Sequence, residues 1–105
     1  MKYRHHHERL DAYRVAVEAA RAIRSASWPA GEADAKSQAK RAANSVVLNI
    51  AEGTAREGKS RRYHYGVASG SAAEATAVLD IVDLECGPEV QQKLRRVAAM
   101  LRRLH

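Results

Sequence analysis

Apolar residues recur at steps of three and four along most of the chain, the spacing of helices that bury one face. No stretch alternates apolar and polar residues in the way that a strand does. The pattern therefore predicts four helices, with proline and glycine near their ends. The predicted limits are from before Leu10 to about Ser25, from Asp34 to Ala55, from Ser60 to Glu85, and from Pro88 to the end of the chain.

Each predicted helix is expected to turn one apolar face inward. In the first two helices these faces comprise Leu10, Tyr13, Val17, Ala20 and Ile23, then Ala35, Ala39, Ala42, Ala43, Val46 and Ile50. In the last two they comprise Tyr63, Val67, Gly70, Glu74, Ala77, Ile81 and Leu84, then Val90, Leu94, Val97, Leu101 and Leu104. Tyr65 lies two residues beyond Tyr63 and is therefore expected on a different side, free to stack on a base or to meet another subunit.

Short connections join consecutive helices, which favours antiparallel neighbours. The predicted fold is all-α, an antiparallel up-down-up-down four-helix bundle formed by a single domain over residues 1–105. Alanine supplies 21 of the residues and Phe is absent. Small side chains let helices approach closely but leave a thin core, so association of several copies is expected to bury further surface.

Cysteine usage and hydropathy predict a cytoplasmic protein. A single cysteine, Cys86, excludes an internal disulfide, and no apolar run is long enough for a membrane span or a secretory signal. No glycine loop that would cradle phosphates is present, so no cofactor is expected. The histidines His5–His7, with His64 and His105, suggest a metal cluster, but adjacent histidines point in different directions and no metal site is expected.

Basic residues are unevenly placed in a chain of formal net charge +6. In the predicted topology, the connection between the second and third helices lies beside both chain ends, and we call this the basic end. It is expected to hold Lys2, Arg4, Arg9, Arg56, Lys59, Arg61, Arg62, Arg102 and Arg103, while the opposite end holds Glu32, Asp34, Asp83, Glu85 and Glu89. Such clustering favours polyanions. The predicted nucleic-acid contacts are Arg56, Lys59, Arg61, Arg62, Arg102 and Arg103; a solvated surface or a protein partner is the alternative.

Polar residues interrupt the second and third helices where aliphatic ones are expected. Asn49 and Glu52 lie three residues apart on one helix, and Ser71 and Glu74 repeat that spacing on the next. These four, with Arg56, could form a hydrolytic site built on paired carboxylates. Ser71 has no nearby histidine at helical spacing, so a structural network that fixes the register of the two helices is preferred. No catalytic residue is therefore predicted.

The run from Lys40 to Gly53 resembles the Arg-Arg-Ala-Ala-x-Ser-Ile-Pro-x-Asn-Ile-Ala-Glu-Gly motif of the four-helix-bundle proteins of 23S rRNA intervening sequences. Further similarities are Arg56, the Gly-Ser-x-x-Glu pattern at Gly70, Ser71 and Glu74, and the Leu-x-x-Tyr pattern at Leu10 and Tyr13. The proline usual in the second helix is Val47 here, so no kink is expected there. The resemblance implies a homopentamer of helical bundles and no established activity.

A more distant similarity is to the accessory variability determinant of diversity-generating retroelements. That resemblance implies a pentamer with a basic surface that binds nucleic acid and a reverse transcriptase. Two hypotheses follow. The chain binds RNA or DNA backbones in the context of rRNA insertions or a mobile element, or it is a structural adaptor that holds a protein such as a reverse transcriptase.

Overall fold

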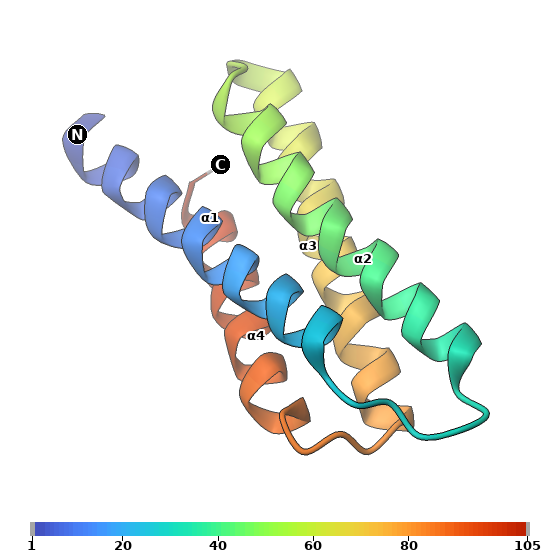
Figure 1. Cartoon of the computed structure of the whole chain (residues 1–105). Coiled ribbons are helices and arrows are strands. Elements are labelled where there is room, and N and C mark those ends of the chain that lie inside the picture. The colour runs from blue at the N-terminus through green and yellow to red at the C-terminus, as the bar shows by residue number, and fades with distance from the viewer. Residues whose placement is uncertain (1, 105) are drawn as a thin grey trace.

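Four α-helices make up most of the computed structural model, which describes the backbone of residues 2–104 and the side chains of residues 7–104 (Figure 1). The helices are α1 (Lys2–Ser25), α2 (Ala33–Thr54), α3 (Gly58–Ile81) and α4 (Gly87–Arg103). No strand occurs within that backbone. The four predicted helices are thus confirmed. The third ends earlier than predicted, because Val82 has an extended backbone (φ −108°, ψ 121°) that directs the chain back over the core.

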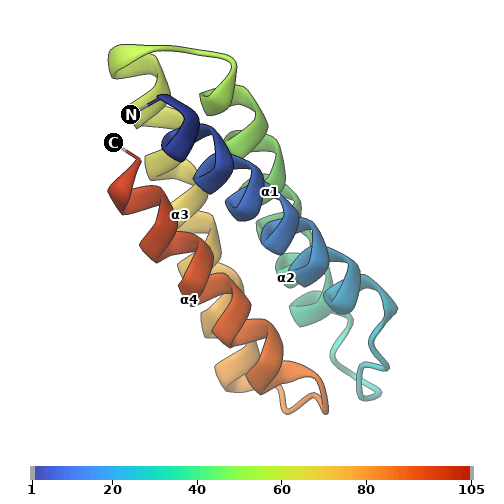
Figure 2. The same cartoon turned by 90° about the vertical axis from the view of Figure 1, so that its left-hand side faces the viewer.

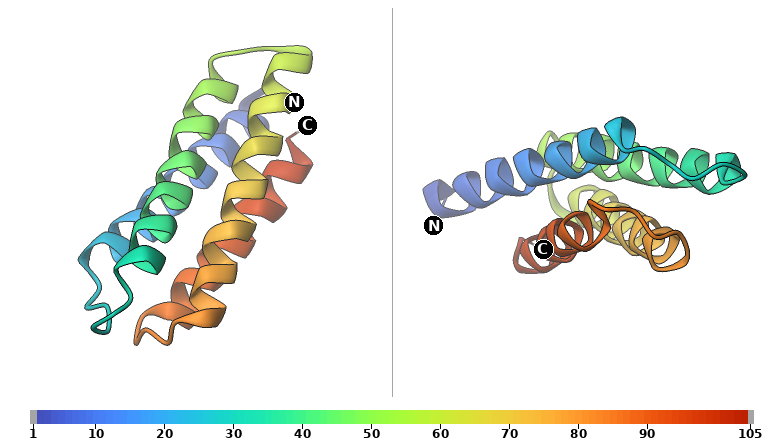
Figure 3. Two further views of the ribbon diagram at one scale, coloured as in Figure 1. Left: turned by 90° about the vertical axis from the view of Figure 1, so that its right-hand side faces the viewer. Right: turned by 60° about the horizontal axis from the view of Figure 1, so that its bottom comes forward.

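The helices run alternately up and down and form two layers, α1 with α2 and α3 with α4 (Figures 1 and 3). Each helix packs against two others: α1 against α2 and α4, and α3 against α2 and α4. The α2–α3 connection lies at the same end as the start of α1 and the end of α4 (Figure 2). This arrangement agrees with the predicted up-down-up-down topology.

Small side chains form the contact between α2 and α3. Buried alanines lie along both helices: Ala39, Ala42 and Ala43 on α2, and Ala68, Ala72 and Ala75 on α3. The predicted inward faces of α2 and α4 are confirmed, with Val46 and Ile50 fully buried on α2 and Leu94 and Leu101 on α4. No kink interrupts α2, which is one helix through Val47.

The predicted inward faces of α1 and α3 are wrong for most of their large residues, although Ile23 and Leu84 are buried as predicted. On α3, Tyr63 is 66% exposed and Ile81 80% exposed, whereas Tyr65 is fully buried. On α1, Leu10 and Tyr13 are also exposed, and the buried residues are Ala12, Val15, Ala16, Ala19 and Ile23. Both helices carry apolar residues on two faces, and the face richer in alanine packs inward because it permits closer helix contact.

None of the helices described here is both long and apolar enough to cross a membrane.

Candidate nucleic-acid interface

The basic end is built around the short α2–α3 connection, Ala55 to Glu57, after which Gly58 takes a left-handed backbone conformation (φ 58°). Arg56 lies in this connection, Lys59, Arg61 and Arg62 follow in the first turns of α3, and Arg102 and Arg103 end α4. The fold therefore brings all six predicted contact residues to one end of the bundle (Figure 2). Their surroundings differ, and three of them have partners within the chain.

Arg61 caps the C-terminus of α2. Its Nε donates to the carbonyl oxygen of Gly53 at 3.0 Å, and its Nη2 donates to that of Thr54 at 3.3 Å. The last carbonyls of a helix have no partner within it, and a cation there also interacts favourably with the helix dipole. The guanidinium of Arg61 therefore has a structural role at the α2–α3 turn.

Two further arginines form ion pairs. Arg56 Nη2 lies 3.1 Å from Glu52 Oε2, and Arg103 Nε lies 3.5 Å from Glu8 Oε2. The Arg56–Glu52 pair is exposed on both sides, and such a pair contributes at most about 1 kcal/mol, so a phosphate can compete with Glu52 for Arg56. In the second pair the Glu8 side chain is only 21% exposed. Together with Glu57, these acids also make the basic end less purely cationic than the sequence suggested.

Lys59, Arg62 and Arg102 are exposed and make no hydrogen bond or ion pair with any other side chain that the structure describes. They are the freest cations of the predicted interface. The side chains of Lys2, Arg4, His5 and His6, and all of His105, lie outside the described residues. The predicted acidic character of the opposite end is incomplete, because α1 and α2 carry basic residues in the half nearer to it: Arg21, Arg24, Lys36, Lys40 and Arg41.

A chain of hydrogen bonds joins α2 to α3 next to this end. Ser45 Oγ lies 2.7 Å from Ser71 Oγ, and Asn49 Nδ2 donates to the Ser45 carbonyl at 2.9 Å and to its Oγ at 3.1 Å. The Oδ1 of Asn49 then accepts from Nδ1 of His64 at 3.0 Å, which requires that this ring nitrogen carry a proton. All four side chains are half-buried, so their hydrogen bonds fix how α2 and α3 align.

The structure places only two of the four predicted network residues, Asn49 and Ser71, in this chain of bonds. Glu52 instead faces solvent and pairs with Arg56, and Glu74 is exposed without a partner among the described side chains. Sequence reasoning missed Ser45 and His64. Ser45 lies one turn before Asn49, and His64 lies two turns before Ser71 on the same face of α3, where it meets Asn49 and not Ser71.

The hydroxyl of Ser71 meets another hydroxyl and not an imidazole, so the network lacks the serine–base contact of a nucleophilic site. Over the described side chains, no three His, Cys, Asp or Glu residues come together in a way that could hold a metal ion. The hydrogen bonds of this network hold α2 and α3 together. The exposed cations of the basic end are available to an anionic partner.

One ion pair lies away from the basic end and joins α4 to α1. Lys93 Nζ lies 2.8 Å from Glu18 Oε1. The hydrogen bond from Lys93, and then its charge, lower the pKa of Glu18, and the same hydrogen bond raises the pKa of Lys93. A carboxyl whose pKa is lowered by folding stabilises the folded state above its ordinary pKa and stops doing so as the pH falls through the lowered value.

These features define a helical-bundle protein of four antiparallel helices with a basic end. A family model described as 23S rRNA-intervening sequence protein matches residues 8–103. The chain therefore belongs to the 23S rRNA-intervening sequence protein family, as the motif from Lys40 to Gly53 predicts. Comparison with curated proteins and with solved structures finds no match.

Proposed function

We propose that this protein is a non-enzymatic, cytoplasmic helical bundle that assembles with copies of itself and binds RNA or DNA backbones through its basic end. The observation that carries the proposal is the set of exposed cations without an internal carboxylate, Lys59, Arg62 and Arg102. Contacts of this kind recognise phosphates without reading sequence. The family name suggests that the nucleic acid belongs to ribosomal RNA insertions, and a mobile element is the related alternative.

The start of α3 adds a second favourable element to this end. Its N-cap, Glu57, forms no side-chain cap with the amides of the first turn. Free amides at a helix N-terminus, together with the helix dipole, favour a phosphate. Lys59 and Arg62 lie in the same first turns and would contact that phosphate or the next one along the backbone.

Self-association is supported by apolar side chains that the single chain leaves in solvent. Tyr63 and Ile81 are exposed on α3, and Leu10 and Tyr13 on α1. Contacts between copies would remove these surfaces from water and enlarge an alanine-rich core. A ring would also repeat each basic end several times, so that weak phosphate contacts add through avidity.

Light scattering on the purified protein tests the assembly. We expect a mass about five times the 11.5 kDa of one chain, the pentamer that the family resemblance implies. Ile81→Glu should lower this mass, because it places a charge in a surface that we expect to be buried between copies. Wild-type protein that scatters as a single chain at high concentration would contradict the proposed assembly.

Nucleic-acid binding is tested by fluorescence anisotropy with a short single-stranded RNA and a DNA duplex. We expect the logarithm of the affinity to fall linearly with the logarithm of salt concentration. Lys59→Glu/Arg62→Glu should weaken binding by about tenfold or more and reduce the salt slope by roughly 1–2, as expected for two lost phosphate contacts. Arg61 is left intact because its loss would also uncap α2.

The matched control is Arg95→Glu/Arg96→Glu, which changes the net charge equally at two exposed arginines of α4. It should weaken binding much less, because these residues lie outside the basic end. Equal loss in both variants would mean that net charge alone drives binding. No measurable affinity at low salt would reject the nucleic-acid proposal.

The second candidate is an adaptor that holds a protein such as a reverse transcriptase. The exposed Tyr63 and Ile81 favour it, since aromatic and aliphatic side chains dominate contacts between proteins. A pull-down that returns one protein in fixed stoichiometry, unaffected by nuclease and lost in Tyr63→Glu, would favour the adaptor over nucleic-acid binding.

A further inference from the structure

We propose a phosphate-group site between α1 and α2, in the half of the bundle away from the basic end. A hollow of about 520 Å³ opens there, and we call it the cationic pocket. Its polar lining comprises Arg24, Lys36, Ser37, Lys40, Arg41 and Asn44. Four cations, a hydroxyl and an amide therefore surround one hollow whose lining includes no carboxylate.

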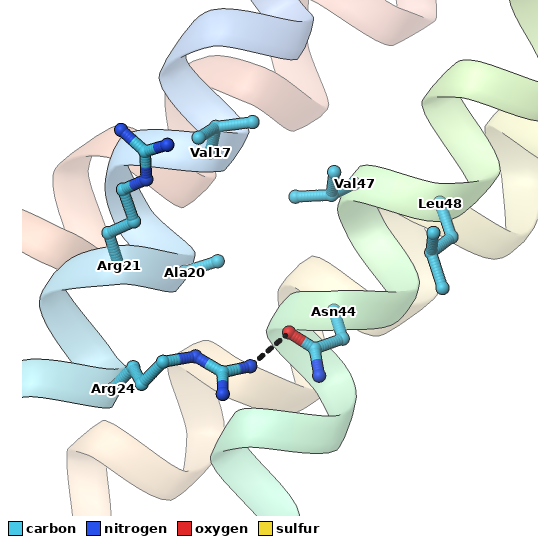
Figure 4. Close-up of a pocket in the computed structure, with 7 residues that line it drawn as sticks. All are labelled: Val17, Ala20, Arg21, Arg24, Asn44, Val47 and Leu48. Atoms are coloured by element: carbon cyan, nitrogen blue, oxygen red, sulfur yellow. Dashed lines mark hydrogen bonds between the residues drawn. The ribbon is translucent and has the colours of Figure 1, made fainter.

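The helical repeat of α2 creates this arrangement. Lys36 and Lys40 are one turn apart on one face, and Ser37 and Arg41 repeat that spacing beside them. Arg24 of α1 reaches across, and its Nη2 donates to Asn44 Oδ1 at 3.3 Å (Figure 4). Both lysines are half-buried and line the hollow.

The cations of this pocket have no carboxylate partner among the described side chains, as Lys59, Arg62 and Arg102 of the basic end also have none, whereas several other cations do. Lys93 pairs with Glu18, Arg56 with Glu52 and Arg103 with Glu8. By contrast, none of the four pocket cations makes an ion pair with a described side chain, and Arg41 donates only to the Ser37 hydroxyl at 2.8 Å.

Like charges one turn apart destabilise a helix. Lys36 and Lys40 are such a pair, and Arg41 adds a third cation next to them. The nearest acids in sequence, Glu32 and Asp34, do not neutralise them through an ion pair. A bound dianion would remove this repulsion, and a phosphate accepts several charge-assisted hydrogen bonds at once. The motif shared with the family begins at Lys40, but the basic end makes no use of this residue or of Arg41.

The pocket continues into a second hollow of about 350 Å³ along the same groove, and the two share Arg24 and Asn44. In this part Val17 and Ala20 of α1 face Val47 of α2, with Leu48 beside it (Figure 4). A ligand that joins a phosphate to an apolar or planar group fits both parts. Nucleotides have this chemistry, whether free or as units of a nucleic acid. The proposal does not depend on the basic end, since a free phosphate compound needs no contact there.

Isothermal titration calorimetry with inorganic pyrophosphate and with a mononucleotide, at matched ionic strength, tests the site. Wild-type protein should bind both saturably, and the nucleotide more tightly because its base and sugar reach the apolar part. Lys40→Glu/Arg41→Glu should raise the dissociation constants by about tenfold or more, because it removes two charge-assisted contacts. Arg95→Glu/Arg96→Glu, with the same change in charge, should leave them nearly unchanged. Lys40→Gln/Arg41→Gln is the milder variant, and circular dichroism confirms folding in each.

Anisotropy with the single-stranded RNA distinguishes the source of the phosphate. If a nucleic acid supplies it, the Lys40/Arg41 variant loses RNA affinity and pyrophosphate competes with RNA. If a free compound supplies it, RNA affinity persists in that variant while pyrophosphate binding is lost; both results support the site. Absence of saturable pyrophosphate binding to the wild type, or equal loss in the α4 control, overturns it.

Light scattering on the same variants provides a further check. If reversal of Lys40 and Arg41 changes the oligomeric mass while the wild type binds no pyrophosphate, carboxylates of a second copy occupy the pocket and the phosphate proposal is overturned. If the Lys59/Arg62 variant binds RNA as well as the wild type does, RNA binding through the basic end is rejected. The pyrophosphate titrations would still decide whether the cationic pocket binds phosphate.

Discussion

Tyr65→Ala is expected to lower the free energy of unfolding by about 3–5 kcal/mol. The ring is fully buried between α2 and α3, and its hydroxyl lies 2.9 Å from Thr54 Oγ1. Removing the ring would leave a cavity where the two helices are in close contact, in addition to the lost apolar burial. Since small domains are stable by only about 5–15 kcal/mol, the variant would lose a large part of its stability.

Urea denaturation followed by circular dichroism, at one protein concentration, measures this effect. The matched control is Tyr63→Ala, two residues earlier on α3, where the side chain is 66% exposed. It should cost less than Tyr65→Ala, because within one chain its removal leaves no buried cavity. A loss above about 0.5 kcal/mol would come from the proposed contacts between copies. A larger loss for Tyr63 than for Tyr65 would restore the inward face that the sequence pattern predicts and contradict the packing described here.

Gly53→Ala is the second large effect, and its sign is opposite to that of most helical glycine substitutions. Alanine normally stabilises a helix interior by about 1 kcal/mol relative to glycine. At Gly53, however, a Cβ would lie 2.5 Å from Cε1 and 2.6 Å from Cδ1 of Tyr65. Because that ring is fully buried, it has little room to move, and overpacking of this kind typically costs about 1–3 kcal/mol. We expect net destabilisation.

Gly66→Ala provides the comparison on α3. A Cβ at Gly66 would meet nothing within 4 Å, and the residue is exposed within the helix. This variant should gain up to about 1 kcal/mol by the propensity effect alone. Thermal or urea unfolding of the two variants should therefore shift in opposite directions. Stabilisation by Gly53→Ala would show that the contact between the glycine and Tyr65 is not close.

The number and order of the helices, and the buried faces of α2 and α4, could be predicted from periodicity because apolar residues of these helices lie mainly on one side. The buried faces of α1 and α3 could not. On α3, the residues at helical spacing from Tyr63 to Ile81 form an apolar face as regular as the face formed by the buried alanines. Periodicity identifies apolar faces but does not say which one packs inside. Here the smaller side chains pack inside because they let the helices approach one another more closely.

The candidate site was predictable to a similar degree. Topology alone brings the basic residues of the α2–α3 connection beside the end of α4. The partners of individual arginines depend on tertiary geometry: Arg61 reaches the Gly53 carbonyl only because the connection turns the chain back on itself. Likewise, Ser45 and His64 join the network across two helices, and spacing along either helix does not reveal that they meet.

The alanine contact between α2 and α3 limits which sequences this architecture accepts. A side chain that gains even one or two carbons at Ala72 or Ala43 would have to push two backbones apart, whereas Leu10 and Tyr13 are about half exposed and have more room to change size. Added bulk is thus poorly tolerated in this part of the interior. The larger residues on the outside can therefore change to suit new partners, while the small buried residues keep the spacing between α2 and α3.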